Sequence, residues 1–222
     1  MIAARYPQLR LTEAGIIEGT FDLHAVFDGE ERKDAFSVRI APPNDPHSMP
    51  TLTEVGGRTA AIAAKYGIAN LADLHQNPGG TACLCVKQDE ANRFPDGAGL
   101  AHFIEELVVP YLFGLSHFND NGKWPWPDYS HGVLGIAEYY VDTVGAPSPH
   151  TITTTVALLQ EDTAWREFSR QIRKPSAMRR CVCGSRKPIS RCHKRVWNAI
   201  QKLNADIHDL GLDMRRTLQK QG

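Results

Sequence analysis

The residues with the clearest metal chemistry lie in a short segment of the last quarter of the chain. It reads Cys181-Val-Cys183-Gly-Ser-Arg-Lys-Pro-Ile-Ser-Arg-Cys192-His193, a C-x-C-x8-C-H pattern. Three thiols and one imidazole make a complete tetrahedral donor set for zinc. No coordination position is left open for water, so the pattern predicts a structural Zn²⁺ held by Cys181, Cys183, Cys192 and His193. In so small a segment, the metal is expected to drive folding.

A second pair of thiols lies in the segment Gly80-Thr-Ala-Cys-Leu-Cys-Val86. If the segment is extended, Cys83 and Cys85 share one face, and the apolar side chains between and beside them share the other. The apolar face should pack on the core, which leaves both thiols outside or in a groove. An accessible thiol beside polar loops is how a nucleophile is presented, whereas a structural thiol is usually buried. The pattern thus favours Cys83 as a nucleophile, with a small core residue as the alternative.

The metal-binding segment resembles the SEC-C motif, whose pattern is C-x-C-G-S-G-K-x-x-x-x-C-[CH]. The match comprises Cys183-Gly-Ser185, Lys187 and Cys192-His193, and the chain departs from the motif at Arg186, where the family often has glycine. The resemblance covers about 15 residues and implies zinc binding, often in an appendage that docks onto another protein. It does not by itself imply an enzymatic activity.

The order of features around Cys83 resembles the ubiquitin-conjugating enzyme fold. That fold runs through a strand meander, a proline-rich crossing, a His-Pro-Asn turn and a Gly-x-x-Cys-Leu segment with the nucleophile. Here Phe36-Ser-Val-Arg-Ile40 precedes a proline-rich stretch, and His75-Gln-Asn77 precedes Gly80-Thr-Ala-Cys83-Leu84. The chain departs from the family at Gln76 and in the insertion 58–74. These departures resemble the divergent bacterial branch found in antiphage defence systems such as CBASS.

The resemblance implies a ubiquitin-conjugating-like transferase that carries a protein C-terminus as a thioester on Cys83 and passes it to an amine. By the same resemblance Asn77 is the oxyanion donor and His75 its structural neighbour. Because Asn77 is closer to Cys83 than in the family, the backbone of Gly79-Gly80 is an alternative source of donors. The partners implied are a ubiquitin-like or other protein with a reactive C-terminus and an activating enzyme.

Two other functions fit the same residues. One is a non-catalytic adaptor that uses the same fold and the zinc segment for binding. The other is a cysteine hydrolase, in which Cys83 would need His75 or His131 within about 3 Å of its thiol. A second metal site built from Cys83, Cys85 and His75 is a further alternative, although no fourth ligand follows.

The elements that position these residues follow an α+β order, with strands first and helices after. Alternating apolar residues predict strands at 21–27 and 36–40, joined by an Asp28-Gly29 turn, and a third strand at 50–55. Residues 59–75 should form one or two short helices broken at Gly67, and residues 81–86 a short strand or an extended segment. The remaining helices are expected at 100–115, 133–141 and 151–172, and from Lys194 onward. We expect an antiparallel meander with flanking helices and a small zinc-stabilised helical module.

Charge divides the chain in the same way. The 25 Lys and Arg balance the 25 Asp and Glu. Residues 165–222 nevertheless hold 15 bases and 4 acids, which leaves 10 bases and 21 acids in residues 1–164. We therefore expect a catalytic domain at 1–150, a connecting helix at 151–174 and a zinc module at 175–222. The basic segment predicts an acidic partner, and nucleic acid would rest on charge alone. No apolar signal core or membrane span is evident, which favours a cytoplasmic protein and no membrane partner.

Overall fold

The computed structural model describes residues 2–43, 45 and 48–219, which form two compact units. Unit 1 comprises the described residues up to Cys85 together with Asp89–Asp128. Unit 2 comprises Val86–Gln88 and the described residues from Tyr129 onward. The units thus divide between Asp128 and Tyr129, upstream of the boundary at residue 150 that the sequence suggests. No helix within the described ranges is long and apolar enough to cross a lipid bilayer.

Unit 1 is built on a four-stranded antiparallel sheet in which the strands are neighbours in chain order. The strands are β1 (Leu9–Leu11), β2 (Ile17–Phe27), β3 (Glu30–Ala41) and β4 (Thr51–Glu54). A tight turn joins β2 to β3, and both of its residues have positive φ, 50° at Asp28 and 79° at Gly29. Such angles match the two-residue hairpin turns that suit the twist of paired strands. The α+β class and the antiparallel meander are confirmed in this form.

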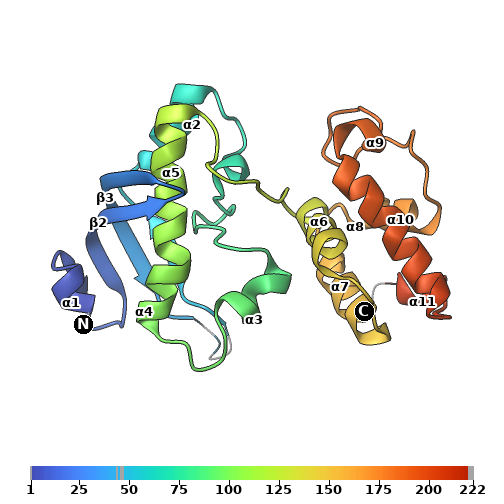
Figure 1. The fold of residues 1–222 in the computed structure, drawn as a ribbon, viewed down its shortest axis with the longest axis horizontal. Helices are drawn as coiled ribbons and strands as arrows, with labels where there is room; N and C mark the ends of the chain where they lie inside the picture. Colours follow the sequence, from blue (N-terminus) through green and yellow to red (C-terminus); the bar gives the residue numbers. More distant parts are fainter. Residues whose placement is uncertain (1, 44, 46–47, 220–222) are drawn as a thin grey trace. The chain divides into compact units, whose positions relative to one another are not determined.

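One face of the sheet is buried under helix α5 (Val109–Asn121), which lies across β2 and β3 (Figure 1). Apolar and polar residues alternate along the strands, and every second side chain points to the same side of the sheet. The apolar side chains therefore form one continuous face that is buried. Phe21, Phe36 and Val38 are at most 2% exposed and pack with α5 residues such as Leu112 and Phe113. At about 25 cal/mol per Å² of apolar area removed from water, this face is the main source of stability for unit 1.

The helix expected at 100–115 is longer and less regular than its apolar pattern indicates. α4 (Leu100–Phe103) runs into a π-helical turn, η3 (Ile104–Val108), and then into α5, which extends to Asn121. Pro110 has no N–H to donate to the carbonyl four residues earlier, and its ring crowds that carbonyl. The wider π turn just before the proline accommodates this lost hydrogen bond.

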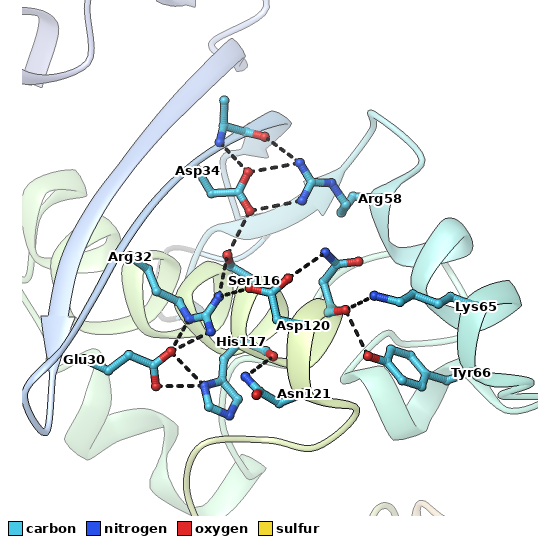
Figure 2. A network of polar contacts seen from close by, with 12 residues as sticks. Glu30, Arg32, Asp34, Arg58, Lys65, Tyr66, Ser116, His117, Asp120 and Asn121 are labelled. Carbon is cyan, nitrogen blue, oxygen red and sulfur yellow. Dashed lines mark hydrogen bonds and ion pairs between the residues drawn. The ribbon is translucent and has the colours of Figure 1, made fainter.

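A network of charged and polar side chains ties β3 to α5 and to α2 (Arg58–Tyr66) (Figure 2). The Arg32 guanidinium donates to Glu30 at 2.6 Å and to Asp120 at 2.8 Å, and its side chain is only 11% exposed. Asp34 accepts two hydrogen bonds from Arg58, both at 3.0 Å, and one from the Ser116 hydroxyl at 2.8 Å. The network satisfies charges that lie at the edge of the apolar core.

Replacing Arg32 with methionine should lower the free energy of unfolding of unit 1 by more than the loss of a fully exposed ion pair does. The apolar side chain fills similar space, but Glu30 and Asp120 lose the cation that they share, and that cation is only 11% exposed although its two partners are 39% and 59% exposed. Urea unfolding followed by circular dichroism measures the change. Arg39→Met is the matched control, because Arg39 is 53% exposed and pairs with Glu18 at 3.6 Å. Its loss should cost less than about 1 kcal/mol, and equal costs for the two variants would contradict the expectation.

Unit 2 is helical and has its own apolar core. Its long helices are α6 (Val133–Thr143), α7 (Pro149–Gln160), α8 (Trp165–Arg173) and α10 (Lys194–Asp209). α10 packs against the other three and contributes Val196, Ile200 and Leu203, all 0% exposed. Ser148 and Thr151 form a capping box that fixes the start of α7. The predicted helices at 133–141 and 151–172 and from Lys194 are therefore present, with a break between α7 and α8.

Candidate thiol site and metal centre

Cys83 lies at the end of a tight hairpin that comes after β4 and α2. The turn between its two arms spans residues 77–81, where the Asn77 N–H donates to the Thr81 carbonyl and the Gly80 N–H to the Asn77 carbonyl, both at 2.8 Å. The arms close where the Cys83 N–H donates to the His75 carbonyl at 2.7 Å. Of the two alternatives expected at 81–86, the regular strand does not form: outside the named strands, only Gln76 and Ala82 form a bridge here. The hairpin therefore places residues 75 and 83 opposite one another.

The side chains of His75, Cys83 and Asp128 form a hydrogen-bonded group. The Cys83 Sγ lies within 4.8 Å of a ring nitrogen of His75. The His75 Nε2 lies 2.6 Å from a carboxylate oxygen of Asp128. His75 is 15% exposed and Asp128 33% exposed, so the group is largely but not fully removed from solvent. A thiol, an imidazole and a carboxylate in this order constitute the arrangement of an activated cysteine nucleophile.

The protonation of His75 follows from its two neighbours. Burial by itself would lower the pKa of the imidazole, because it disfavours the charged form. The hydrogen bonds with Asp128 and Cys83 outweigh burial and raise the pKa of His75 to about 9. The ring is therefore a cation at neutral pH. A cation beside a thiol favours the thiolate, which is the reactive form.

Aromatic packing holds the imidazole in place. The ring of Trp124 meets that of His75 edge to face, with centroids 4.6 Å apart, and its indole N–H donates to the Asp73 carbonyl at 3.1 Å. Trp124 can lie this close to α5 only because residue 114 is glycine. A Cβ there would come within 2.3 Å of the indole ring. The loop that ends at Asp128 is thus anchored on α5 and is not free to drift from His75.

The other residues predicted for this site have different surroundings. Cys85 packs against the apolar core of unit 1, and burial raises the pKa of its thiol to about 12. Cys83 and Cys85 are both partly exposed, and the packing of Cys85 against the core makes it the less available of the two thiols. The Asn77 amide donates to the Thr81 hydroxyl at 3.2 Å and to the Ala82 carbonyl at 3.4 Å, and so supports the hairpin turn. His131 belongs to unit 2.

The four predicted zinc ligands come together in unit 2. The ligand atoms of Cys181, Cys183, Cys192 and His193 all lie within 4.8 Å of one another, although only the last two are adjacent in sequence. A bridge between Arg180 and Pro188 and a hydrogen bond from the Cys181 N–H to the Lys187 carbonyl close the loop. The short helix α9 (Ile189–Cys192) then returns the second pair of ligands to the first.

The spacing of these atoms fits a tetrahedral ion. Zinc bonds of about 2.3 Å to sulfur and about 2.0–2.1 Å to nitrogen imply ligand-to-ligand distances of roughly 3.5–3.8 Å. The Cys183 and Cys192 sulfurs are 3.5 Å apart, and the Cys181 sulfur is 3.2 Å from the His193 Nδ1. The Ser185 hydroxyl lies 3.0 Å from the Cys192 sulfur and can orient that ligand. This group could hold a metal ion, as the sequence predicts.

Comparisons of the chain with models of protein families, with curated proteins and with solved structures gave no match. Asp128 and Trp124 therefore emerge from the geometry alone. In the sequence they lie in a loop rich in glycine, proline and tryptophan, and no local pattern links that loop to His75.

Proposed function

We propose that the chain is a cysteine-dependent acyl transferase of the ubiquitin-conjugating type, with a structural Zn²⁺ bound by Cys181, Cys183, Cys192 and His193. The observation that carries the first part is the hydrogen-bonded group of Cys83, His75 and Asp128 at the end of the hairpin. The antiparallel meander, followed by this hairpin and by a helix across the sheet, supports the comparison with ubiquitin-conjugating enzymes.

The proposed chemistry has two steps. The Cys83 thiolate attacks the thioester carbonyl of a carrier, a new sulfur–carbon bond forms, and the carrier leaves as a thiolate. An amine then attacks the new thioester, an amide forms, Cys83 leaves as a thiolate, and the proton of the amine passes to bulk water. His75, held by Asp128, stabilises the thiolate before the first step and after the second. For Asn77 to act as the oxyanion donor, its amide must exchange its turn partners for the developing oxyanion.

The second candidate is a cysteine hydrolase, and a specific observation favours it. Conjugation needs only an accessible thiolate, whereas hydrolysis also needs a base to activate water. Once Cys83 is acylated, the thiolate that helps to keep His75 protonated is gone, and the neutral imidazole held by Asp128 can then act as that base. The two activities share the acyl-enzyme and differ in what attacks it. Water releases an acid, whereas an amine leaves an amide.

Acylation of Cys83 by a fluorescent peptide thioester that ends in glycine tests the proposal. Mass spectrometry should find one peptide on Cys83, acquired faster than on a free peptide of residues 80–88 and removed by excess thiol, which takes the acyl group. Cys83→Ser should give no thiol-sensitive adduct, and Cys85→Ser, the matched control, should behave as wild type. Amide formation with added lysine supports transfer, whereas steady release of the acid supports the hydrolase. Acylation no faster than that of the free peptide would contradict both and leave a binding module.

A further inference from the structure

The loop that brings the metal ligands together is surrounded by positive charge. Residues 168–205 contain eleven Lys and Arg and no Asp or Glu. Three of these cations are paired: Arg170 with Glu167, Arg195 with Asp142, and Lys202 with Asp206. Seven others are exposed and make no ion pair with any residue that the structure describes. They are Arg173, Lys174, Arg180, Arg186, Lys187, Arg191 and Lys194, and we call them the basic surface.

Five members of the basic surface are set by the metal loop itself. Arg180 precedes Cys181, Arg186 and Lys187 lie in the turn, and Arg191 and Lys194 flank the second ligand pair. Because the four ligand atoms lie within 4.8 Å of one another, the backbones that carry these cations are held on one small scaffold. A cluster of exposed, unpaired charge of one sign is a site for a partner of opposite sign.

The backbone conformation of Arg186 is a second, independent indication that this loop binds a ligand. Its φ of 62° lies in the left-handed region, which glycine adopts freely and a residue with a Cβ adopts only under strain. The loop thus presents a strained residue whose guanidinium is exposed. Backbone strain of this kind tends to be kept at binding sites. The strain is understandable if the side chain at this tip contacts an anion.

The composition of the surface distinguishes between anionic partners. A protein interface usually has a desolvated apolar centre within a polar rim. Among the described residues of unit 2, Met178 is the one large apolar side chain that is strongly exposed. Binding of single-stranded nucleic acid usually needs exposed aromatic rings for stacking. Trp165 and Phe168 are buried, and Trp197 is partly buried against the core. The surface therefore fits best a partner with regularly spaced negative charges that is bound through those charges alone, without base stacking or apolar contacts.

We infer that the basic surface binds the phosphate backbone of double-stranded nucleic acid without sequence preference. Guanidinium and ammonium groups neutralise phosphates and release condensed counterions, so the affinity should fall steeply with salt. The site lies on the metal-binding loop and is separate from Cys83, so this inference stands or falls independently of the proposed acyl transfer.

Fluorescence anisotropy with a labelled random-sequence 20-base-pair DNA, between 50 and 200 mM NaCl, tests the inference on the full-length, zinc-loaded protein. Neutralising Arg186, Lys187 and Arg191 with glutamine should weaken binding about tenfold or more at 150 mM salt and reduce the salt slope by about 3. The matched control neutralises three exposed cations of unit 1, Arg10, Lys33 and Lys123, and should bind as wild type.

Folding is checked by zinc content and circular dichroism. The second variant, Arg173→Gln with Lys174→Gln, lies at the end of α8, outside the loop between the ligands, and should reduce the slope by about 2. Three results would overturn the inference: no binding at 50 mM salt, equal losses in the unit 1 control, or tighter binding of a single strand or a polyglutamate peptide than of the duplex.

Discussion

Replacing His75 with glutamine should slow the alkylation of Cys83 by iodoacetamide about 10- to 100-fold at pH 6.5. In the wild-type protein the raised pKa of His75, about 9, keeps the ring cationic at this pH, and the cation stabilises the thiolate. Glutamine keeps the size and a hydrogen bond but carries no charge. The thiol should then ionise near the ordinary cysteine pKa of about 8.5, so that only about 1% is thiolate at pH 6.5.

The difference in alkylation rate between wild type and His75→Gln should depend on pH. As the pH rises through 9, His75 loses its proton and its charge, so the two rates should converge. Peptide mass spectrometry follows alkylation at Cys83 from pH 5.5 to 9.5. His24→Gln is the control, because His24 is 62% exposed on β2 and pairs with Glu31. Asp128→Asn should produce an intermediate loss, since it removes the carboxylate that keeps His75 protonated. Equal rates at pH 6.5 in wild type and His75→Gln would show that His75 does not activate the thiol.

Removing the metal from unit 2 should unfold the loop from Ser176 to His193. Metal binding contributes roughly 10 kcal/mol or more to the folding of small zinc modules, because the liganded loop has little other core. Here Cys181 and Ile189 are the two core residues of the loop that are fully or nearly fully buried. Hydrogen exchange should show loss of amide protection by a factor of about 100 or more across the loop after treatment with a strong chelator. The strands β2 and β3 should remain protected, because their core belongs to unit 1.

Ligand variants separate metal loss from other effects of the chelator. Cys181→Ser should lower the zinc content below one ion per chain and give the same loss of protection without chelator. Cys83→Ser should keep its zinc. Ser185→Ala should retain the ion with weaker affinity, since it removes the hydroxyl near the Cys192 sulfur. Full protection of the loop in a protein that contains no metal would refute the structural role of the ion.

Patterns confined to neighbouring residues made the elements and the metal ligands predictable. Alternation identifies β2 and β3 because a strand with one buried face must repeat every second residue. The Cys-x-Cys and Cys-His pairs predict the four residues that come close enough to hold a metal ion, because a tetrahedral ion needs a short and specific set of donors. The helix at 100–115 was predictable from the spacing of its apolar residues. The π turn before Pro110 was not, because a lost backbone hydrogen bond does not change that spacing.

Cys85 shows the limit of what local patterns predict. Alternation places it beside Cys83, but the hairpin around Gly80 is held by turn hydrogen bonds and by a bond from the Ala82 N–H to the Leu52 carbonyl of β4. That attachment turns the chain, and Cys85, although partly exposed, packs against the core. A face assigned from alternation therefore holds only where the segment is a paired strand.

From its residue types alone, the chain predicted a candidate metal site, a candidate nucleophilic thiol near a histidine and a division of charge, because each depends on chemistry carried by a few neighbouring residues. Only the tertiary structure supplied Asp128 and the orientation of His75 toward Cys83. The carboxylate reaches the imidazole because Trp124 packs into the space that Gly114 leaves on α5. The contact between Asp128 and His75 thus depends on packing between residues that are far apart in the sequence. This contact distinguishes Cys83 from the other thiols as the candidate nucleophile.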